Sequence, residues 1–286
     1  MLLDNLKNNV KIKCESEYGQ LCRVVMCPPT FLQIKDIIND VQKHYYKKNI
    51  DIEKALGQFN ELFDFMKRKG IEIDLLPSDS SLPEQVFTRD IGAVINNSFI
   101  KSNMSTSVRC GEERILKEWL DNMKIPHNTL DSENIEGGDI IIDHKDLWVG
   151  IGNRTSPNAV QILENQFPSH HIHPINITDP YLHLDCIFNV IAPNIALVLP
   201  KAIESKNLQF LSTKYKLIDV SEEEHFHMGI NVLSIGNREI LSLPQNTKVN
   251  EKMRESGLQV YEIDISEIIK SGGSFRCITL PLNRED

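Results

Sequence analysis

Basic side chains are in the minority in this sequence of 286 residues, in which 31 lysines and arginines face 40 aspartates and glutamates, a formal net charge of −9. A nucleic-acid partner is therefore not expected. Apolar runs such as residues 195–199 have the length of strands, well short of the roughly 18 residues that span a bilayer, so no membrane attachment is predicted. The first residues hold no apolar segment that ends in small side chains, which disfavours a secretory signal and predicts a cytoplasmic location.

Cysteine motifs are also missing. The six cysteines form no C-x-x-C pair and have no closely spaced histidine partners, so neither a zinc site nor a disulfide scaffold is predicted. Reduced thiols are expected instead, with at most one or two of them reactive. With 41% hydrophobic and 25% charged residues, the composition is that of a globular protein with a packed core.

A repeated unit is the most informative feature of the sequence. Pairs of apolar runs separated by a short turn begin at residues 92, 140, 187 and 230, so successive pairs are 48, 47 and 43 residues apart. Most of the turns contain Asn or Gly, for example Asn96-Asn97 and Gly236-Asn237, which tolerate the positive φ of tight hairpins. Such a near-constant period is typical of repeat proteins.

A helical stretch and a further short strand follow each hairpin. The helices are predicted near residues 112–123, 157–166, 208–215 and 247–256, and the strands near 125–130, 171–177, 216–220 and 258–263. Each unit is thus a ββαβ module, which cannot bury both of its faces alone.

A fifth module is divided between the two ends of the chain. Residues 22–27, a long helical stretch over 32–69 and a strand at 71–76 begin it, and residues 277–280 supply its missing strand. Closure of this kind is typical of propellers. We therefore predict an α/β fold, a five-module pseudosymmetric β/α propeller that forms a single domain over residues 1–286. The alternative is an open mixed sheet in which the similar hairpins are accidental.

Polar residues of catalytic type recur at one position of the module, just before its first strand. They are Asp90, Glu136, Asp139, His183, Asp185 and Cys277. In a closed ring these positions meet at the centre. Taken singly, each also has a structural interpretation, because Asp often caps a turn and a histidine or cysteine among apolar neighbours is often part of the core. The shared position in the repeat favours a site.

Two arginines occupy a second equivalent position, after the hairpins of the first and second modules. They are Arg109 and Arg154. Guanidinium groups at the rim of an acidic centre suggest a substrate with a carboxylate at one end and a cation at the other, such as an amino acid with a basic side chain. The alternative is that both are surface charges.

Four ordered motifs resemble those of the guanidino-group-modifying superfamily, which includes arginine deiminase, dimethylarginine dimethylaminohydrolase and the amidinotransferases. The motifs are Phe87-Thr88-Arg89-Asp90, Glu136-Gly137-Gly138-Asp139, His183-Leu184-Asp185, and Gly272-Gly273 ahead of Cys277. The resemblance extends from about residue 23 to residue 282. It implies a five-module β/α propeller, a small-molecule guanidino substrate and a reaction that needs neither metal nor organic cofactor. Dimers are common in the family, so a homodimer is compatible with it.

The resemblance also implies a role for individual residues. Cys277 is the nucleophile, His183 the general acid and base, and Glu136 the carboxylate that orients the imidazole. The substrate-binding residues that it implies are Asp90 and Asp185 for the guanidinium, Arg109 and Arg154 for the carboxylate, Glu84 as a further acid and Phe87 as a packing ring.

The family members differ in features that this sequence mixes. Its length matches the dimethylargininases, because arginine deiminases usually carry an additional helical insertion. Asp185 instead resembles the arginine deiminases and amidinotransferases, since the dimethylargininases usually lack an acid there and leave room for methyl groups. We predict hydrolysis of arginine or an Nω-methylated arginine to citrulline and ammonia or an amine, through a covalent thiouronium intermediate.

Two alternatives from other functional classes stay open. They are an amidinotransferase that passes the amidino group to an amine, and a non-catalytic arginine-binding protein. The loop-like stretches 5–18 and 78–83 are candidates for a lid over the site.

Overall fold

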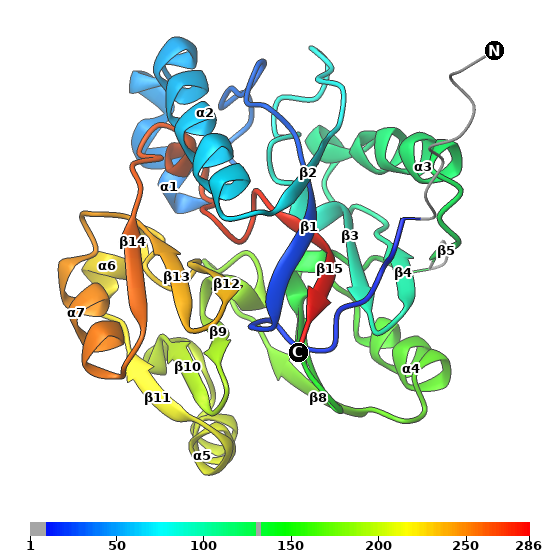
Figure 1. The fold of residues 1–286 in the computed structure, drawn as a ribbon, viewed down its shortest axis with the longest axis vertical. Coiled ribbons are helices and arrows are strands. Elements are labelled where there is room, and N and C mark those ends of the chain that lie inside the picture. The colour runs from blue at the N-terminus through cyan, green and yellow to red at the C-terminus, as the bar shows by residue number, and fades with distance from the viewer. Residues whose placement is uncertain (1–9, 130–132) are drawn as a thin grey trace.

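Small three-stranded sheets are the building units of the structure. The computed structural model describes residues 10–129 and 133–286, and over these residues the strands form five such sheets, with helices around the outside (Figure 1). The strands of four sheets are β3 (Gly92–Ile95), β4 (Ser98–Lys101) and β5 (His127–Thr129); β6 (Ile140–Asp143), β7 (Asp146–Ile151) and β8 (His171–Asn176); β9 (Phe188–Ala192), β10 (Ile195–Val198) and β11 (Lys216–Asp219); and β12 (Leu233–Gly236), β13 (Glu239–Ser242) and β14 (Gln259–Glu262).

These four sheets share one topology. In each, the first strand pairs antiparallel with the second, and the third pairs parallel with the second. The helices that connect the second strand to the third are α3 (Glu112–Asn122), α4 (Pro157–Gln166), α5 (Ser205–Lys214) and α7 (Thr247–Glu255). The predicted ββαβ modules are therefore confirmed, while α6 (Glu222–Phe226) was not predicted. Of the strand predicted over 125–130, residue 130 lies outside the described residues.

The hairpin turns have the predicted backbone chemistry. Asn96, Asn194 and Asn237 have φ values of 51°, 60° and 50°, and His144 has 53°. Asn tolerates this left-handed conformation because its short side chain hydrogen-bonds locally. These turns all lie at one end of the sheets, opposite the end where the first strands begin.

The fifth sheet joins the two ends of the chain. Its central strand, β1 (Gln20–Met26), pairs antiparallel with β15 (Leu280–Glu285) and parallel with β2 (Glu72–Leu75). The pairing of terminal strands is thus confirmed. The strand predicted at 277–280 begins only at Leu280, because residues 274–279 form a helix-like turn in which the Ile278 N–H donates to the Ser274 carbonyl at 3.0 Å. Cys277 therefore precedes the strand.

The long helix predicted over 32–69 was wrong as a single element. It is divided into α1 (Asp40–Tyr45), which continues as a short 3-10 turn, and α2 (Ile52–Arg68). Side-chain caps start both helices, since Asn39 accepts from the Gln42 N–H and Asp51 from the Lys54 N–H. Because an N-cap starts a new helix, the cap at Asp51 separates α2 from α1. The apolar spacing alone does not reveal this boundary.

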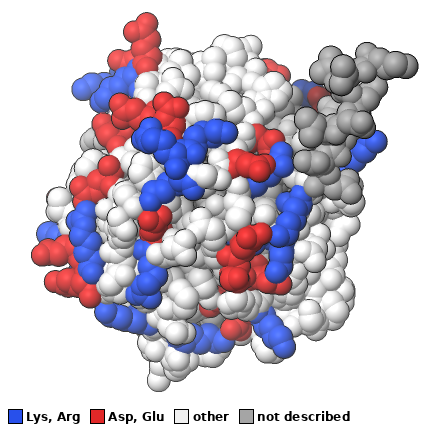
Figure 2. All heavy atoms as spheres, in the orientation of Figure 1, with Lys and Arg blue, Asp and Glu red and all other residues white. Residues whose placement is uncertain are grey.

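The apolar core lies between the sheets and the surrounding helices. Helix α2 buries Ala55, Phe59, Leu62 and Met66 on one face at helical spacing. Strands of neighbouring sheets contact each other, with β15 beside β3, β6 beside β9, β9 beside β12 and β12 beside β1, and the turns that precede β3 and β6 also contact each other. Acidic and basic side chains are interspersed on the face in Figure 2. Across residues 10–129 and 133–286, no helix combines the length and apolarity of a membrane span.

Residues 10–18 cross the end of the sheets that carries the hairpin turns. Cys14 and Asn96 exchange two backbone hydrogen bonds, and the His144 N–H donates to the Glu15 carbonyl. Ser16 forms an isolated bridge with Asp143. The described part of the candidate lid 5–18 therefore covers the end opposite the first-strand positions, and residues 5–9 lie outside the described residues.

Candidate active site

A pocket with about 290 Å³ of empty space lies at the end where the first strands begin. Seven of the nine predicted site residues line it, namely Glu84, Phe87, Asp90, Arg109, Arg154, His183 and Cys277. The other two lie behind this wall, Glu136 against His183 and Asp185 against Cys277. The repeat thus brings together residues from four of the modules.

Cys277 sits in a turn held by an asparagine from another module. The N–H groups of Cys277 and Ser274 both donate to Asn231 Oδ1, at 3.1 and 3.2 Å. The thiol is 3% exposed, and its sulfur lies 3.9 Å from Asp185 Oδ2. Burial, together with the negative charges of Asp185 and Asp90, raises the pKa of the Cys277 thiol well above its usual range.

Asn231 is a site residue that sequence reasoning missed. It lies two positions before β12 and is therefore the contribution of the fourth module to the same repeat position. This equivalent position in the repeat could have identified Asn231 from the sequence. Its side chain is a neutral amide and, unlike the other residues at this position, does not titrate.

Glycine at position 273 allows the turn that carries Cys277 to approach the pocket wall. A Cβ placed there would lie 2.5 Å from the ring of Phe87 and 3.0 Å from the Cβ of Cys277. Both distances are too short for a side chain. The close packing next to Cys277 therefore explains why the Gly272-Gly273 motif has a glycine at position 273.

His183 and Glu136 form a close, buried pair. His183 Nε2 lies 2.7 Å from Glu136 Oε2, and Glu136 Oε1 accepts hydrogen bonds from the N–H and the hydroxyl of Ser105, both at 3.0 Å. Although burial favours its neutral form, the hydrogen bond and charge of His183, with Arg154, lower the pKa of Glu136 to about 2. The carboxylate is therefore ionised throughout the neutral range.

The imidazole is correspondingly held as a cation. Burial alone would lower its pKa, but the negative charges of Asp90, Asp139 and Glu136 raise the pKa of His183 to about 10. Its Nδ1 lies 3.6 Å from Asp90 Oδ1. At neutral pH His183 is able to donate a proton into the pocket.

The guanidinium groups of the two predicted arginines differ in how many hydrogen bonds they already make within the protein. Arg109 Nη1 lies 2.5 Å from Asp90, and its other donors bond Glu112 at 2.7 Å and the Phe87 carbonyl at 3.0 Å. Arg154 Nη1 lies 3.5 Å from Glu136 and has no hydrogen-bond partner among the described residues. A contact between Arg109 and a substrate carboxylate stays a prediction, since its guanidinium already orients Asp90.

Glu112 was also missed from the sequence. It lies in the first turn of α3, three residues after Arg109, and is completely buried against that arginine. The i, i+3 spacing of an acid and a base was the signal.

Asp90 carries an unsatisfied oxygen. Its Oδ2 is bound to Arg109, whereas the buried Oδ1 has no hydrogen-bond partner in the described part of the chain. An unpartnered buried carboxylate oxygen is costly unless a donor reaches it. A cationic ligand with N–H groups would supply that donor.

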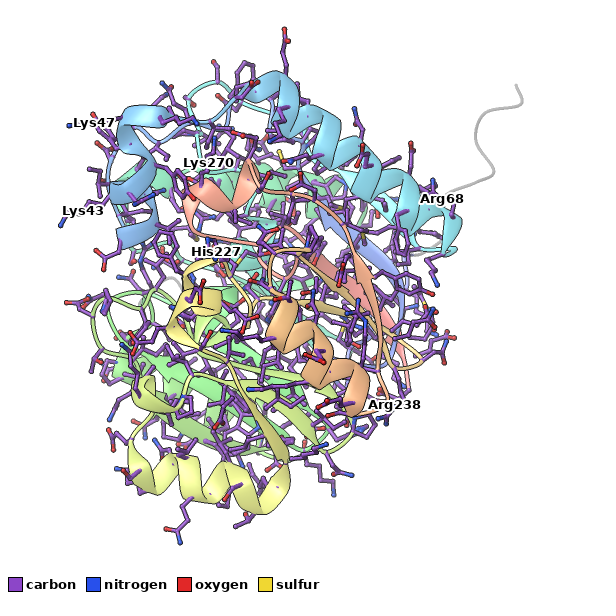
Figure 3. The ribbon with its side chains drawn as sticks, turned by 90° about the vertical axis from the view of Figure 1, so that its left-hand side faces the viewer. Lys43, Lys47, Arg68, His227, Arg238 and Lys270 are labelled. Atoms are coloured by element: carbon purple, nitrogen blue, oxygen red, sulfur yellow. The ribbon has the colours of Figure 1, made fainter. Side chains whose placement is uncertain are left out.

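Glu84 lies at a second wall of the pocket, built by α1 and residues 268–271. It accepts hydrogen bonds from Ser271 Oγ at 2.9 Å and from Gln42 Nε2 at 2.9 Å. Burial raises the pKa of Glu84 to about 8, although Arg109 opposes this shift. Figure 3 shows Lys270 on the segment beside α1, the helix that carries Lys43.

Asp139 holds a turn in place, which is the structural role that the sequence left open as the alternative to a catalytic one. It accepts from the Leu184 N–H at 2.9 Å and from the Thr155 hydroxyl at 2.6 Å. These bonds fix the turn that carries His183. No cluster of three or more potential metal ligands occurs among residues 10–129 and 133–286.

Comparison with known proteins identifies the family of the chain and several relatives. Residues 29–284 match a model of the family described as N,N dimethylarginine dimethylhydrolase, eukaryotic. The uncharacterized protein YkgA of Bacillus subtilis is 44% identical over 278 residues, 97% of each chain. The N(G),N(G)-dimethylarginine dimethylaminohydrolase of Mycobacterium tuberculosis is 25% identical over 267 residues, 91% of this chain and 86% of that one.

A solved structure has the same fold. The N-terminal domain of ArgZ, a cyanobacterial arginine dihydrolase, bound to its product superposes with a TM-score of 0.84 at 24% identity, over 93% of this chain and 98% of that domain.

Proposed function

The chain belongs to the dimethylarginine dimethylhydrolase family within the guanidino-group-modifying superfamily, and from this premise we propose that it hydrolyses the guanidinium group of an arginine-type substrate. The observation that carries the proposal is the single pocket lined by Cys277, His183 and Asp90. It joins a nucleophile, a proton donor and a carboxylate of which one oxygen lacks a hydrogen-bond partner among the described residues.

We also propose that the five sheets form one closed β/α propeller over residues 1–286. The contacts between strands and turns of neighbouring sheets support it, as does the pairing of β1 with β15. A cytoplasmic location and a homodimer remain predictions from the sequence.

Substrate binding begins with the carboxylates. A guanidinium is planar, and its delocalised charge makes its carbon a poor electrophile, so the site must hold it in place and keep bulk water out. Asp90 offers its unpartnered Oδ1, and Asp185 lies on the other side, behind the sulfur of Cys277. Arg154, whose Nη1 has no hydrogen-bond partner among the described residues, is the better placed arginine for the substrate carboxylate.

The cationic substrate then activates the nucleophile. Burial and two aspartates favour the protonated Cys277 thiol, whereas a bound cation adds a positive charge that stabilises the thiolate. Cys277 loses its proton to solvent as the substrate enters. The thiolate sulfur then bonds to the guanidinium carbon and gives a tetrahedral adduct.

His183 supplies and removes protons in the steps that follow. Its imidazolium protonates the departing nitrogen, which leaves as ammonia or an amine, and a covalent thiouronium remains on Cys277. The neutral imidazole then takes a proton from water, whose oxygen bonds to the same carbon. The carbon–sulfur bond breaks, and a ureido product of the citrulline type leaves. General acid and base help of this kind contributes about 10²- to 10⁴-fold.

The position of Asp185 bears on which arginine is the better substrate. The carboxylate is fully buried, and its Oδ2 lies 3.9 Å from the nucleophile. A dimethylated nitrogen beside it would place two apolar methyl groups against a buried carboxylate, which carries a desolvation cost. We therefore propose arginine or monomethylarginine as better substrates than dimethylarginine.

Kinetics with these three compounds test the proposal. The assay measures the ureido product by colour and separates citrulline, ornithine, ammonia and methylamines by chromatography, so that deimination, demethylamination and dihydrolysis are distinguished. Added glycine reveals amidino transfer if it diverts the product. The absence of product from all three compounds would refute the proposal.

A pair of cysteine variants tests the mechanism. Cys277→Ser is expected to abolish turnover while substrate binding, followed by calorimetry, persists. Cys110→Ser is the matched control, because Cys110 is exposed, and it is expected to retain the activity of the unmodified protein. Turnover by Cys277→Ser at the original rate would remove this cysteine from the chemistry.

A further inference from the structure

A buried network of charged side chains lies beneath Cys277 and reaches the opposite end of the sheets. Its members are Glu17, Arg89, Asp185 and Arg276, each at most 3% exposed. Arg276 Nε lies 3.2 Å from Asp185 Oδ2 and its Nη2 lies 3.1 Å from Glu17 Oε1, while Arg89 Nη2 lies 3.0 Å from the same oxygen. Two guanidinium groups thus balance two carboxylates.

Backbone groups fix the network in place. Arg276 and Arg89 both donate to the carbonyl of Ile140, at 3.0 and 2.7 Å, and the Ile142 N–H donates to Glu17 at 3.1 Å. Strand β6 therefore sets the position of both guanidinium groups. The protein's own backbone therefore holds the network in position.

The network ends at the nucleophile. Asp185 Oδ2, which accepts from Arg276, is also the oxygen that lies 3.9 Å from the Cys277 sulfur. A carboxylate this close to a thiolate repels it, because both carry negative charge. A guanidinium bound to the same oxygen offsets that repulsion.

We propose that Arg276 is a positioning residue which, held by Glu17, neutralises the Asp185 carboxylate beside the sulfur of Cys277 and so favours the thiolate. The N-terminal segment that carries Glu17 thereby supports the site from the far end of the sheets. The inference rests on the proposed role of Cys277 as the nucleophile.

The other titratable and charged groups around the network stay constant in the test. Asp90, Cys186 and His183 face the sulfur or Asp185 from the neighbouring modules, and Arg284 lies near Glu17. None of them is altered in the variants below. A change in thiol reactivity therefore reports on Arg276 and Glu17.

Alkylation of the full-length protein by iodoacetamide is the experiment, with the extent of reaction at Cys277 followed by mass spectrometry over a range of pH. Arg276→Met is expected to slow the reaction about tenfold at a fixed pH, which corresponds to a rise of about one in the thiol pKa. Arg276→Lys keeps the positive charge and is expected to recover most of the rate. A purely structural role for Arg276 would leave the pH dependence unchanged.

A double variant separates reactivity from stability. Arg276→Met leaves Glu17 and Asp185 without their shared partner, and a buried unpaired charge is destabilising. In Glu17→Gln/Arg276→Met the remaining Arg89 and Asp185 balance each other, so the thermal midpoint is expected to rise toward that of the unmodified protein while alkylation stays about tenfold slow.

Two results would overturn the inference. One is an Arg276→Met protein that unfolds at the original temperature and reacts at the original rate. The other is a double variant that regains both stability and the original rate. Because iodoacetamide replaces the substrate, the alkylation result holds even if no guanidino compound is hydrolysed, so a failure of the proposed function is recognised separately.

Discussion

Replacing Glu136 by glutamine perturbs the centre of the proposed acid and base chemistry. The variant keeps the size of the side chain and an oxygen near His183 Nε2, which lies 2.7 Å from the carboxylate. It removes one negative charge from a completely buried position. The remaining charges of Asp90 and Asp139 still favour the imidazolium.

The expected magnitude follows from the charged hydrogen bond. A hydrogen bond to an ionised group contributes about 1.5–3 kcal/mol, which corresponds to a change of about 1–2 in pKa. The pKa of His183, held at about 10 in the native site, is therefore expected to fall to about 8–9 in Glu136→Gln. The same energy lowers kcat/KM about 10- to 100-fold.

The pH dependence of kcat/KM is the assay. Its basic limb reports the loss of the proton from the free enzyme's general acid, so the limb is expected to move to lower pH in Glu136→Gln. Glu118→Gln is the matched control, because Glu118 is exposed and pairs only with the exposed Arg114. A variant whose kcat/KM falls while the basic limb stays in place would refute the argument that Glu136 holds the imidazolium.

Three further predictions concern the turn of the nucleophile and the buried carboxylates. Asn231→Ala deprives two N–H groups of their acceptor, and is expected to lower the free energy of unfolding by about 1–3 kcal/mol and to slow turnover. Gly273→Ala forces a methyl group against the Phe87 ring, with an expected loss of about 1–3 kcal/mol in chemical denaturation. Glu17 and Glu136 have a folded pKa of about 2, below the usual 4.5, so the stability that they contribute is present above about pH 4.5 and is lost as pH falls toward 2.

Distinct results would contradict each of these. Unfolding of Asn231→Ala at the original denaturant concentration would show that its hydrogen bonds are dispensable. Wild-type turnover in Gly273→Ala would show that the turn moves freely away from the ring. A thermal midpoint that stays constant from pH 5 to pH 2, across the window where both carboxylates take up protons only on unfolding, would contradict the pH argument.

The repeat and the order of the motifs could be predicted from the sequence alone. The hairpin turns depend on local chemistry, such as the positive φ that Asn96 and Asn237 adopt, and the module length is visible as a spacing. The position just before the first strand then selected Asp90, His183 and Cys277, which line one pocket. In a closed repeat, residues at equivalent positions of different modules lie close together in space. These residues could therefore be grouped without knowledge of any long-range contact.

Boundaries and partnerships depended on the tertiary structure. The helix predicted over 32–69 divides where Asp51 caps α2, and Cys277 precedes its strand because a neighbouring module supplies Asn231. Hydrogen bonds of this kind join residues that no local pattern relates. The apolar spacing reports which face is buried, but not where a helix ends.

The electrostatics of the site were likewise decided only by the folded chain. Arg109 has the type and spacing of a substrate ligand, yet Asp90 and Glu112 already occupy it. Arg276 is adjacent to Cys277 in sequence, but its partner Glu17 lies near the other end of the chain. The residue types that the chemistry needs can be read from the sequence. The ionisation of each group is set by how deeply it is buried and by which charges lie within a few ångströms, and these are properties of the packed structure.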